Sequence, residues 1–111
     1  MKIFWGLAMN VGEYLGRNRL EGIYVLIIYD ISLDASRSNF AKLMEGFGFR
    51  VQKSAFEAYL TPGKYEKLLR LIPGCIDPAT DSVRVYQLHC SCDIRLFGSN
   101  RQIRADDAVI I

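Results

Sequence analysis

The sequence predicts a single α+β domain in which two helices cover one face of a four-stranded antiparallel sheet. Three observations carry this prediction: an unbroken apolar run at residues 23–29, two segments with apolar residues at helical spacing, and a slip in the alternating pattern of residues 50–60. The chain has 111 residues, half of them hydrophobic, which suits one domain with a modest core.

The first element is a strand over residues 23–29, Ile-Tyr-Val-Leu-Ile-Ile-Tyr. Its β-branched and aromatic residues are typical of a central strand covered on both faces. Asp30 ends the run, at a place where open α/β sheets often present functional groups. The plainer alternative is that Asp30 and Ser32 only start the next helix or form an Asx turn.

A first helix is predicted after this strand, because apolar residues recur at positions i, i+3, i+4 and i+7. These residues are Phe40, Leu43, Met44 and Phe47. Ser32 or Asp34 is the expected N-cap, and Gly46 or Gly48 is the expected stop.

Residues 50–60 are predicted to form two strands. Val51 is odd-numbered, whereas Phe56, Ala58 and Leu60 are even-numbered, so the alternation slips near residues 53–55. A continuous strand would then turn one apolar set to water, so a bulge or a tight junction is expected there.

The second helix is expected to begin at Thr61 and Pro62 and to end before Pro73 and Gly74. Its predicted apolar face consists of Tyr65, Leu68, Leu69 and Ile72. A turn at residues 77–81 leads to a last strand at residues 82–89. The order β-α-β-β-α-β is that of the ferredoxin-like sandwich.

Apolar segments also lie beyond this core. Residues 93–98 read as an extra C-terminal strand, and residues 108–111 form an apolar end. Together with one bare sheet face, they favour a homodimer.

Residues 1–22 are predicted to be an N-terminal extension that precedes the ferredoxin-like domain at 23–111. The helical spacing of Phe4, Leu7, Ala8, Val11 and Leu15 indicates a short amphipathic helix, although three glycines weaken it. The apolar run at residues 3–9 is too short to cross a bilayer, so no membrane association is expected.

The three cysteines, Cys75, Cys90 and Cys92, have no framework spacing and fit a reducing cytoplasm, where we expect the protein to be. A zinc site at the last two, beside His89, would need a fourth ligand that the sequence does not offer.

The net charge of +2 does not by itself indicate a nucleic-acid-binding protein, but the charges are unevenly distributed. Residues 37–70 carry seven cations and three anions, which permits a phosphate-facing surface. A solvated helix face is the usual alternative.

Asp30 is the main candidate for chemistry, since no phosphate loop or nucleophile elbow is present. Magnesium needs only one or two protein carboxylates, so two copies of Asp30 across a twofold axis would form a reasonable site for hydrolysis of a phosphodiester. Arg37 falls in the first turn of the helix, where the dipole disfavours a cation, so a phosphate or Asp30 is a candidate partner; a plain surface arginine is the alternative.

These residues resemble a known family. Tyr29, Asp30 and Ile31, then Arg37 seven residues after the aspartate, then residues 48–57 (Gly-Phe-Arg-Val-Gln-Lys-Ser-Ala-Phe-Glu), are similar to the small CRISPR-associated Cas2 proteins. The likeness runs from about residue 23 to the C-terminus and includes residues 81–86. Asn39 stands where some members have a second basic residue, and residues 1–22 are additional.

The resemblance implies a ferredoxin-like homodimer that bridges pairs of the integrase Cas1 on DNA during spacer acquisition. It also implies a magnesium-dependent endonuclease or endoribonuclease that acts on DNA or RNA. On this basis Asp30 is the metal ligand, Asp30 and Arg37 are the catalytic residues, and supporting positions are Tyr29, Arg50, Ser54 and Phe56. We expect Ser32 to be a further supporting residue. The candidate contacts to the nucleic-acid backbone are Arg37, Lys42, Arg50 and Lys53.

A toxin-type ribonuclease that resembles virulence-associated protein D is the second interpretation, since that family shares the fold and an early aspartate. The segment from Arg50 to Glu57 favours the CRISPR-associated family instead.

Overall fold

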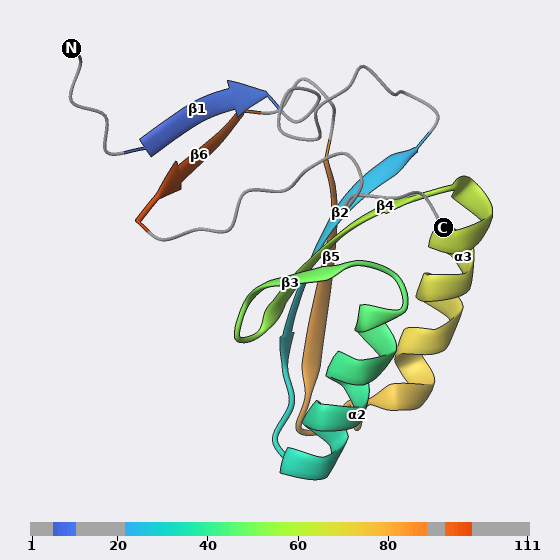
Figure 1. Cartoon of the computed structure of the whole chain (residues 1–111). Coiled ribbons are helices and arrows are strands. Elements are labelled where there is room, and N and C mark those ends of the chain that lie inside the picture. The colour runs from blue at the N-terminus through green and yellow to red at the C-terminus, as the bar shows by residue number, and fades with distance from the viewer. Residues whose placement is uncertain (1–5, 11–21, 89–92, 99–111) are drawn as a thin grey trace.

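The computed structural model describes residues 6–10, 22–88 and 93–98 of the chain (Figure 1). The elements in chain order are β1 (Gly6–Asn10), β2 (Ile23–Asp30), α2 (Asp34–Glu45), β3 (Phe49–Gln52), β4 (Ala55–Leu60), α3 (Pro62–Leu71), a 3₁₀ turn (Ile72–Cys75), β5 (Ser82–Leu88) and β6 (Asp93–Phe97).

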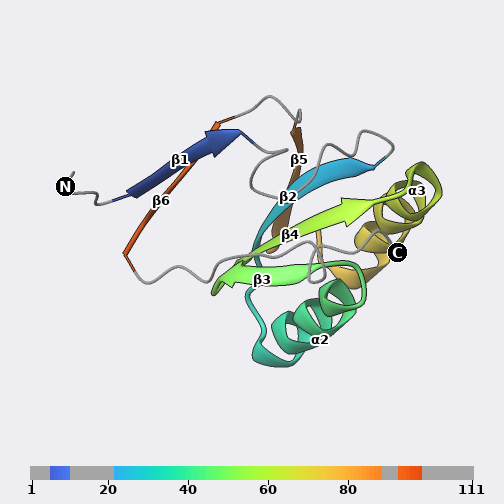
Figure 2. The same ribbon diagram turned by 45° about the horizontal axis from the view of Figure 1, so that its top comes forward.

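Four strands form an antiparallel sheet in the order β3-β4-β2-β5, with β2 and β4 in the centre. Both helices lie on the same face of this sheet, as Figures 1 and 2 show. In the register, Ile27 of β2 faces Phe56 of β4 and Val85 of β5. The predicted ferredoxin-like arrangement is therefore confirmed.

The core lies between the sheet and the helices and is built on alternate residues of β2. Val25, Ile27 and Tyr29 are at most 2% exposed and belong to one buried cluster. Partners from the other elements are Phe40, Ala41, Met44, Phe47, Phe56, Ala58, Leu60, Leu68 and Ile72. Burying so many large apolar side chains supplies most of the driving force for folding.

The other face of β2 is less covered than the sequence predicts. Tyr24 is buried and Leu26 is partly buried, but Ile28 is 40% exposed and Asp30 is exposed. The expectation that β2 is covered on both faces is therefore wrong for the second half of the strand. Both helices pack on the face that carries Val25, Ile27 and Tyr29, and they leave Ile28 and Asp30 uncovered.

Helix α2 begins differently from the prediction. Its N-cap is Leu33, which has no capping side chain, rather than Ser32 or Asp34. Ser32 instead donates from its hydroxyl to the carbonyl of Thr80, 3.1 Å away. The predicted stop is confirmed, since Gly46 is the C-cap and its N–H bonds to the carbonyl of Leu43 at 3.1 Å.

Helix α3 begins as predicted, with Pro62 at its start and Thr61 as the N-cap. The Thr61 hydroxyl accepts a hydrogen bond of 3.3 Å from the backbone N–H of Lys64. Leu68 and Ile72 are buried, but Leu69 is 41% exposed, so its predicted place in the core is wrong.

The predicted slip in residues 50–60 is confirmed as a hairpin. Strands β3 and β4 are joined by a turn at residues 53–54, and the register shifts between Arg50 and Gln52. Arg50 lies directly opposite Phe56 in the register; Phe56 is buried, whereas Arg50 is exposed.

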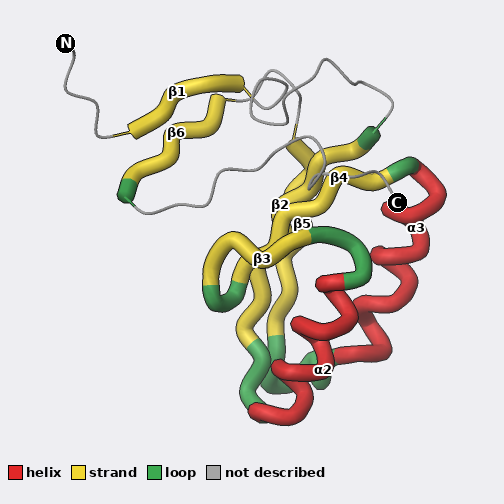
Figure 3. The backbone as a smooth tube through the Cα atoms, in the orientation of Figure 1, coloured by secondary structure: helices red, strands yellow, loops and turns green. Residues whose placement is uncertain are grey.

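Strands β1 and β6 form a separate two-stranded antiparallel sheet (Figure 3). The predicted C-terminal strand is confirmed, but the predicted helix is wrong for Gly6–Asn10, because a remote segment supplies backbone partners that sequence spacing cannot reveal. The rest of that predicted helix lies outside the described residues, as do His89, Cys90, Cys92 and residues 108–111.

Gly48 leaves no room for a side chain where α2 passes into β3. A Cβ there would lie 2.1 Å from the carbonyl oxygen of Glu57 and 2.8 Å from the Cβ of Ala58. We expect Gly48→Ala to lower the free energy of unfolding by about 1–3 kcal/mol or more, because backbone would have to move. Denaturant-induced unfolding measures this loss.

Gly63→Ala is the matched control, since a Cβ there meets no atom within 4 Å. It should be neutral or slightly stabilising, because alanine favours the helix. Equal stability of the two variants would contradict a close approach at Gly48.

Candidate functional site

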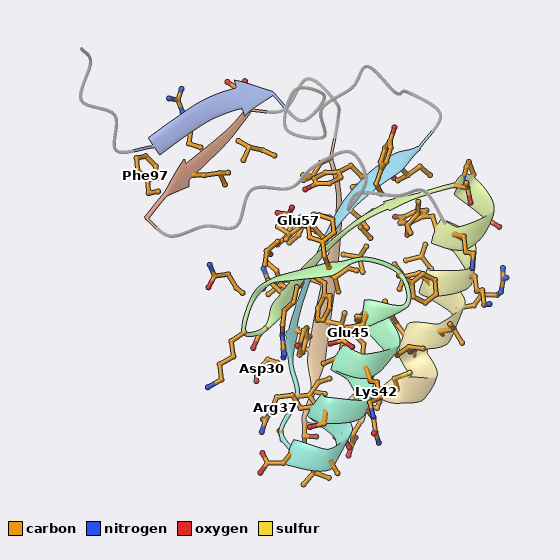
Figure 4. All side chains as sticks on the ribbon, in the orientation of Figure 1. Asp30, Arg37, Lys42, Glu45, Glu57 and Phe97 are labelled. Carbon is orange, nitrogen blue, oxygen red and sulfur yellow. The ribbon has the colours of Figure 1, made fainter. Side chains whose placement is uncertain are left out.

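Asp30 is the last residue of β2 and is exposed on the face that the helices leave open. The alternation of the strand places its side chain opposite to that of the buried Tyr29. In the register it faces Ser82, the first residue of β5. Figure 4 shows Asp30 and Arg37 at the same end of the molecule, where β2 passes into α2.

Arg37 lies in the first turn of α2 and is fixed by two groups. Its Nη1 donates to the carbonyl of Ile31 at 2.9 Å, and its Nη2 forms an ion pair with the carboxylate of Asp34. The acidic partner offsets the unfavourable position of a cation at a helix N-terminus. Asp34, not Asp30, is thus the acidic partner of Arg37, whose side chain remains 40% exposed.

Tyr29 joins the buried core to the basic side chains of the β3–β4 hairpin. Its ring packs 4.8 Å from that of Phe40, centroid to centroid. Its hydroxyl donates to the carbonyl of Lys53 and accepts from Nη2 of Arg50, each at 3.1 Å.

Arg50 is consequently held in one orientation. Its Nη2 also donates to the Lys53 carbonyl at 3.0 Å, and its Cζ lies 5.7 Å from the centre of the Phe56 ring. A cation over an aromatic face gains favourable electrostatic energy. Its side chain also lines the cleft between α2 and the hairpin.

A cleft of about 520 Å³ lies between α2 and the hairpin. It is lined by Arg37, Ser38, Ala41, Lys42, Glu45, Arg50, Lys53 and Ser54. All four side chains predicted to contact a nucleic-acid backbone therefore line one cleft, together with the predicted supporting residue Ser54. Asp30 is not among its lining residues, so the structure separates the candidate metal ligand from the basic cleft.

Ser32 and Asp81 connect the loop after β2 with the loop before β5. The backbone N–H of Ser32 donates to Oδ1 of Asp81 at 3.0 Å. Oδ2 of Asp81 accepts from the N–H of Asp77 at 2.9 Å, and Oδ1 also accepts from the hydroxyl of Thr80 at 3.1 Å. The Asp77 and Ser32 bonds lower the pKa of Asp81 from its ordinary value.

Asp81 was not a predicted site residue. The only signal in the sequence is its place at the end of the predicted turn, next to the last strand. Its contact with Ser32 spans 49 positions, which no local pattern could indicate.

Asp30 offers a metal ion one exposed carboxylate. Within residues 6–10, 22–88 and 93–98, no three acidic, histidine or cysteine side chains are grouped as a metal site. Magnesium retains several waters and takes only one or two carboxylates, so an exposed Asp30 fits as one of its ligands. The donor type suits a hard cation rather than zinc.

Comparison with known proteins identifies relatives over most of the chain. The family described as "CRISPR associated protein Cas2" matches residues 23–95. The "CRISPR-associated endoribonuclease Cas2" of Mycobacterium tuberculosis is 37% identical over 107 residues, which cover 96% of this chain and 91% of that protein. A Cas2 endoribonuclease of Chloroflexus aurantiacus is 45% identical over 71 residues, which cover 63% of this chain and 76% of the relative.

Two solved structures have a fold similar to that of this chain. A hypothetical protein from Thermus thermophilus has a TM-score of 0.66 and 30% identity, covering 72% of this chain and 95% of that one. Streptococcus pyogenes Cas2 has a TM-score of 0.55 and 34% identity, covering 60% of this chain and 86% of that one. Among the described residues, neither helix is long and apolar enough to span a membrane.

The lowered pKa of Asp81 predicts a pH-dependent contribution to stability. Because the folded state favours the ionised form, this contribution is complete above the ordinary pKa of 3.8 and is lost as the pH falls through the folded value. Asp81→Asn should therefore lower the free energy of unfolding at about pH 7, and the difference from wild type should shrink at about pH 3.

Urea unfolding at both pH values measures this effect. Glu66→Gln, which removes an exposed carboxylate of α3, is the control for the loss of a negative charge. A difference that is equal at the two pH values would show that the Asp81 charge is not responsible.

Proposed function

The chain belongs to the CRISPR-associated Cas2 family, and from this we propose that it is a magnesium-dependent nuclease that hydrolyses phosphodiester bonds as a homodimer. The observation that carries the proposal is Asp30, an exposed carboxylate at the end of the central strand, on the open face of the sheet. Because several relatives are named endoribonucleases, RNA is the first substrate to test and DNA the second.

The open face of the sheet supports the homodimer. Ile28 is 40% exposed and Tyr86 is 42% exposed, and they lie on the neighbouring strands β2 and β5. Large apolar side chains on a sheet face favour association. A second copy packed on this face would bury both side chains and bring its own Asp30, two residues from Ile28, toward the first.

In this dimer the two Asp30 carboxylates would hold the metal ion. When bound, magnesium lowers the pKa of a water and offsets negative charge on the phosphate. Arg37, which lies at the same end of the molecule as Asp30 (Figure 4), would supply positive charge to stabilise the scissile phosphate. The cations of the cleft would hold flanking phosphates of the strand.

Asp30→Asn removes the charge while keeping the size of the side chain. We expect cleavage of labelled RNA or DNA with magnesium to fall about 100-fold or more, a barrier increase of about 2.7 kcal/mol. Glu66→Gln, on the outer side of α3, is the matched control and should cleave as wild type does. Unchanged cleavage by Asp30→Asn would remove Asp30 from the mechanism.

Mixed dimers test whether the site is shared. When wild-type and Asp30→Asn subunits are combined and allowed to exchange, activity should fall more steeply than the fraction of wild-type subunits, because each site needs two Asp30 residues. Activity proportional to that fraction would contradict a shared site.

A second function, as an adaptor that joins the integrase Cas1 on DNA during spacer acquisition, is favoured by the basic cleft. Arg37, Lys42, Arg50 and Lys53 line it without Asp30, so phosphate binding does not require the metal ligand. Phosphate contacts give affinity with little sequence preference and make binding sensitive to salt.

The double variant Lys42→Ala/Lys53→Ala should weaken duplex DNA binding about tenfold and reduce the salt dependence by about two phosphate contacts. Lys67→Ala/Arg70→Ala on α3 has the same net charge and should bind more tightly than the cleft variant. Fluorescence anisotropy at several salt concentrations measures both. Equal weakening by the two variants would contradict a specific role of the cleft.

The Asp30→Asn variant also separates the two functions. As an adaptor, the protein should still bind DNA and support spacer acquisition when this variant no longer cleaves. Loss of acquisition despite normal dimer formation and integrase binding would contradict a purely structural role.

A further inference from the structure

Three residues, 31–33, connect Asp30 at the end of β2 with α2, which carries Arg37. The carbonyl of Ile31 accepts from Nη1 of Arg37, and the carbonyl of Leu33 accepts from the backbone N–H of Arg37, both at 2.9 Å. The orientation of this connecting segment therefore determines how the Asp30 carboxylate and the Arg37 guanidinium lie relative to each other.

Side-chain and backbone bonds from the loop before β5 hold the middle of this segment. The N–H of Ser32 donates to Oδ1 of Asp81 at 3.0 Å, and the hydroxyl of Ser32 donates to the carbonyl of Thr80 at 3.1 Å. Ser82, which follows Asp81, faces Asp30 in the β2–β5 register. The segment after β2 and the loop before β5 are thus joined at two places: at the Asp30–Ser82 pair and at Ser32.

Asp81 is itself held by its own loop. Its backbone N–H donates to the carbonyl of Asp77 at 2.8 Å, and its carboxylate accepts from the N–H of Asp77 and the hydroxyl of Thr80. Bonds to an ionised carboxylate are stronger than bonds between neutral groups. The carboxylate that anchors residues 31–33 is therefore itself held by its own loop.

We propose that Asp81 is a positioning residue of the candidate site: by binding the N–H of Ser32, it fixes residues 31–33 and thereby the placement of Asp30 and Arg37. This inference rests on the proposed function for the role of Asp30 as a metal ligand. Residues that orient metal ligands from outside the coordination sphere commonly change metal affinity about 10–100-fold when they are replaced.

Asp81→Ala and Asp77→Ala in the full chain form a matched pair. They remove the same group from the same loop, but the Asp77 carboxylate accepts from the N–H of Ala79 within the loop, whereas Asp81 reaches Ser32. A role in loop stability alone would affect both variants, and a role in positioning would be specific to Asp81. Asp81→Glu tests whether a longer carboxylate restores the contact.

Two measurements are made on the folded proteins: manganese affinity, from water-proton relaxation, and amide hydrogen exchange of Ser32 by NMR. In Asp81→Ala we expect about tenfold weaker manganese binding and about tenfold faster Ser32 exchange. In Asp77→Ala both should stay within about twofold of wild type. Partial recovery in Asp81→Glu would support the same conclusion.

Unchanged Ser32 exchange in Asp81→Ala, or equal loss of manganese affinity in the two alanine variants, would overturn the positioning role. Asp30→Asn distinguishes a failure of the proposed function. If this variant binds manganese as wild type does, Asp30 is not the metal ligand; faster Ser32 exchange in Asp81→Ala would still support the positioning of residues 31–33 by Asp81.

Discussion

The central strand β2 is the constraint on which the rest of the structure depends. Side chains of a strand alternate between two faces, so one segment supplies both the core and the candidate site. Val25, Ile27 and Tyr29 are buried against the helices, whereas Ile28 and Asp30 are exposed on the other face. The packing that stabilises the fold thus also determines where the carboxylate is presented.

The connections at the end of β2 convert this strand into a site. Tyr29 reaches from the core to the β3–β4 hairpin and orients Arg50 at the cleft. Ser32 binds the loop that precedes β5. Arg37, Lys42, Arg50 and Lys53 therefore line one cleft, and Asp30 is not among its lining residues. Such an arrangement permits nucleic-acid binding and metal-dependent cleavage to be separated by mutation.

Local chemistry explains why much of the fold could be predicted. The Thr61 cap, the proline after it and the slip in the hairpin act over a few neighbouring residues, so their signals are visible in the sequence. The start of α2 was mispredicted because Ser32 has a better partner in a loop distant in sequence. Gly6–Asn10 was mispredicted for a similar reason, since pairing with β6 overrides a weak helical pattern.

The sequence by itself determined the order of the elements, the family resemblance and the position of Asp30 at the end of the first core strand. Only the tertiary structure decided that Asp30 lies on the open face, that Arg37 pairs with Asp34, and that Asp81 binds the segment after Asp30. The physical reason is that a strand with apolar residues on both faces does not indicate which face the helices cover. Contacts between distant loops likewise exist only once the sheet has formed.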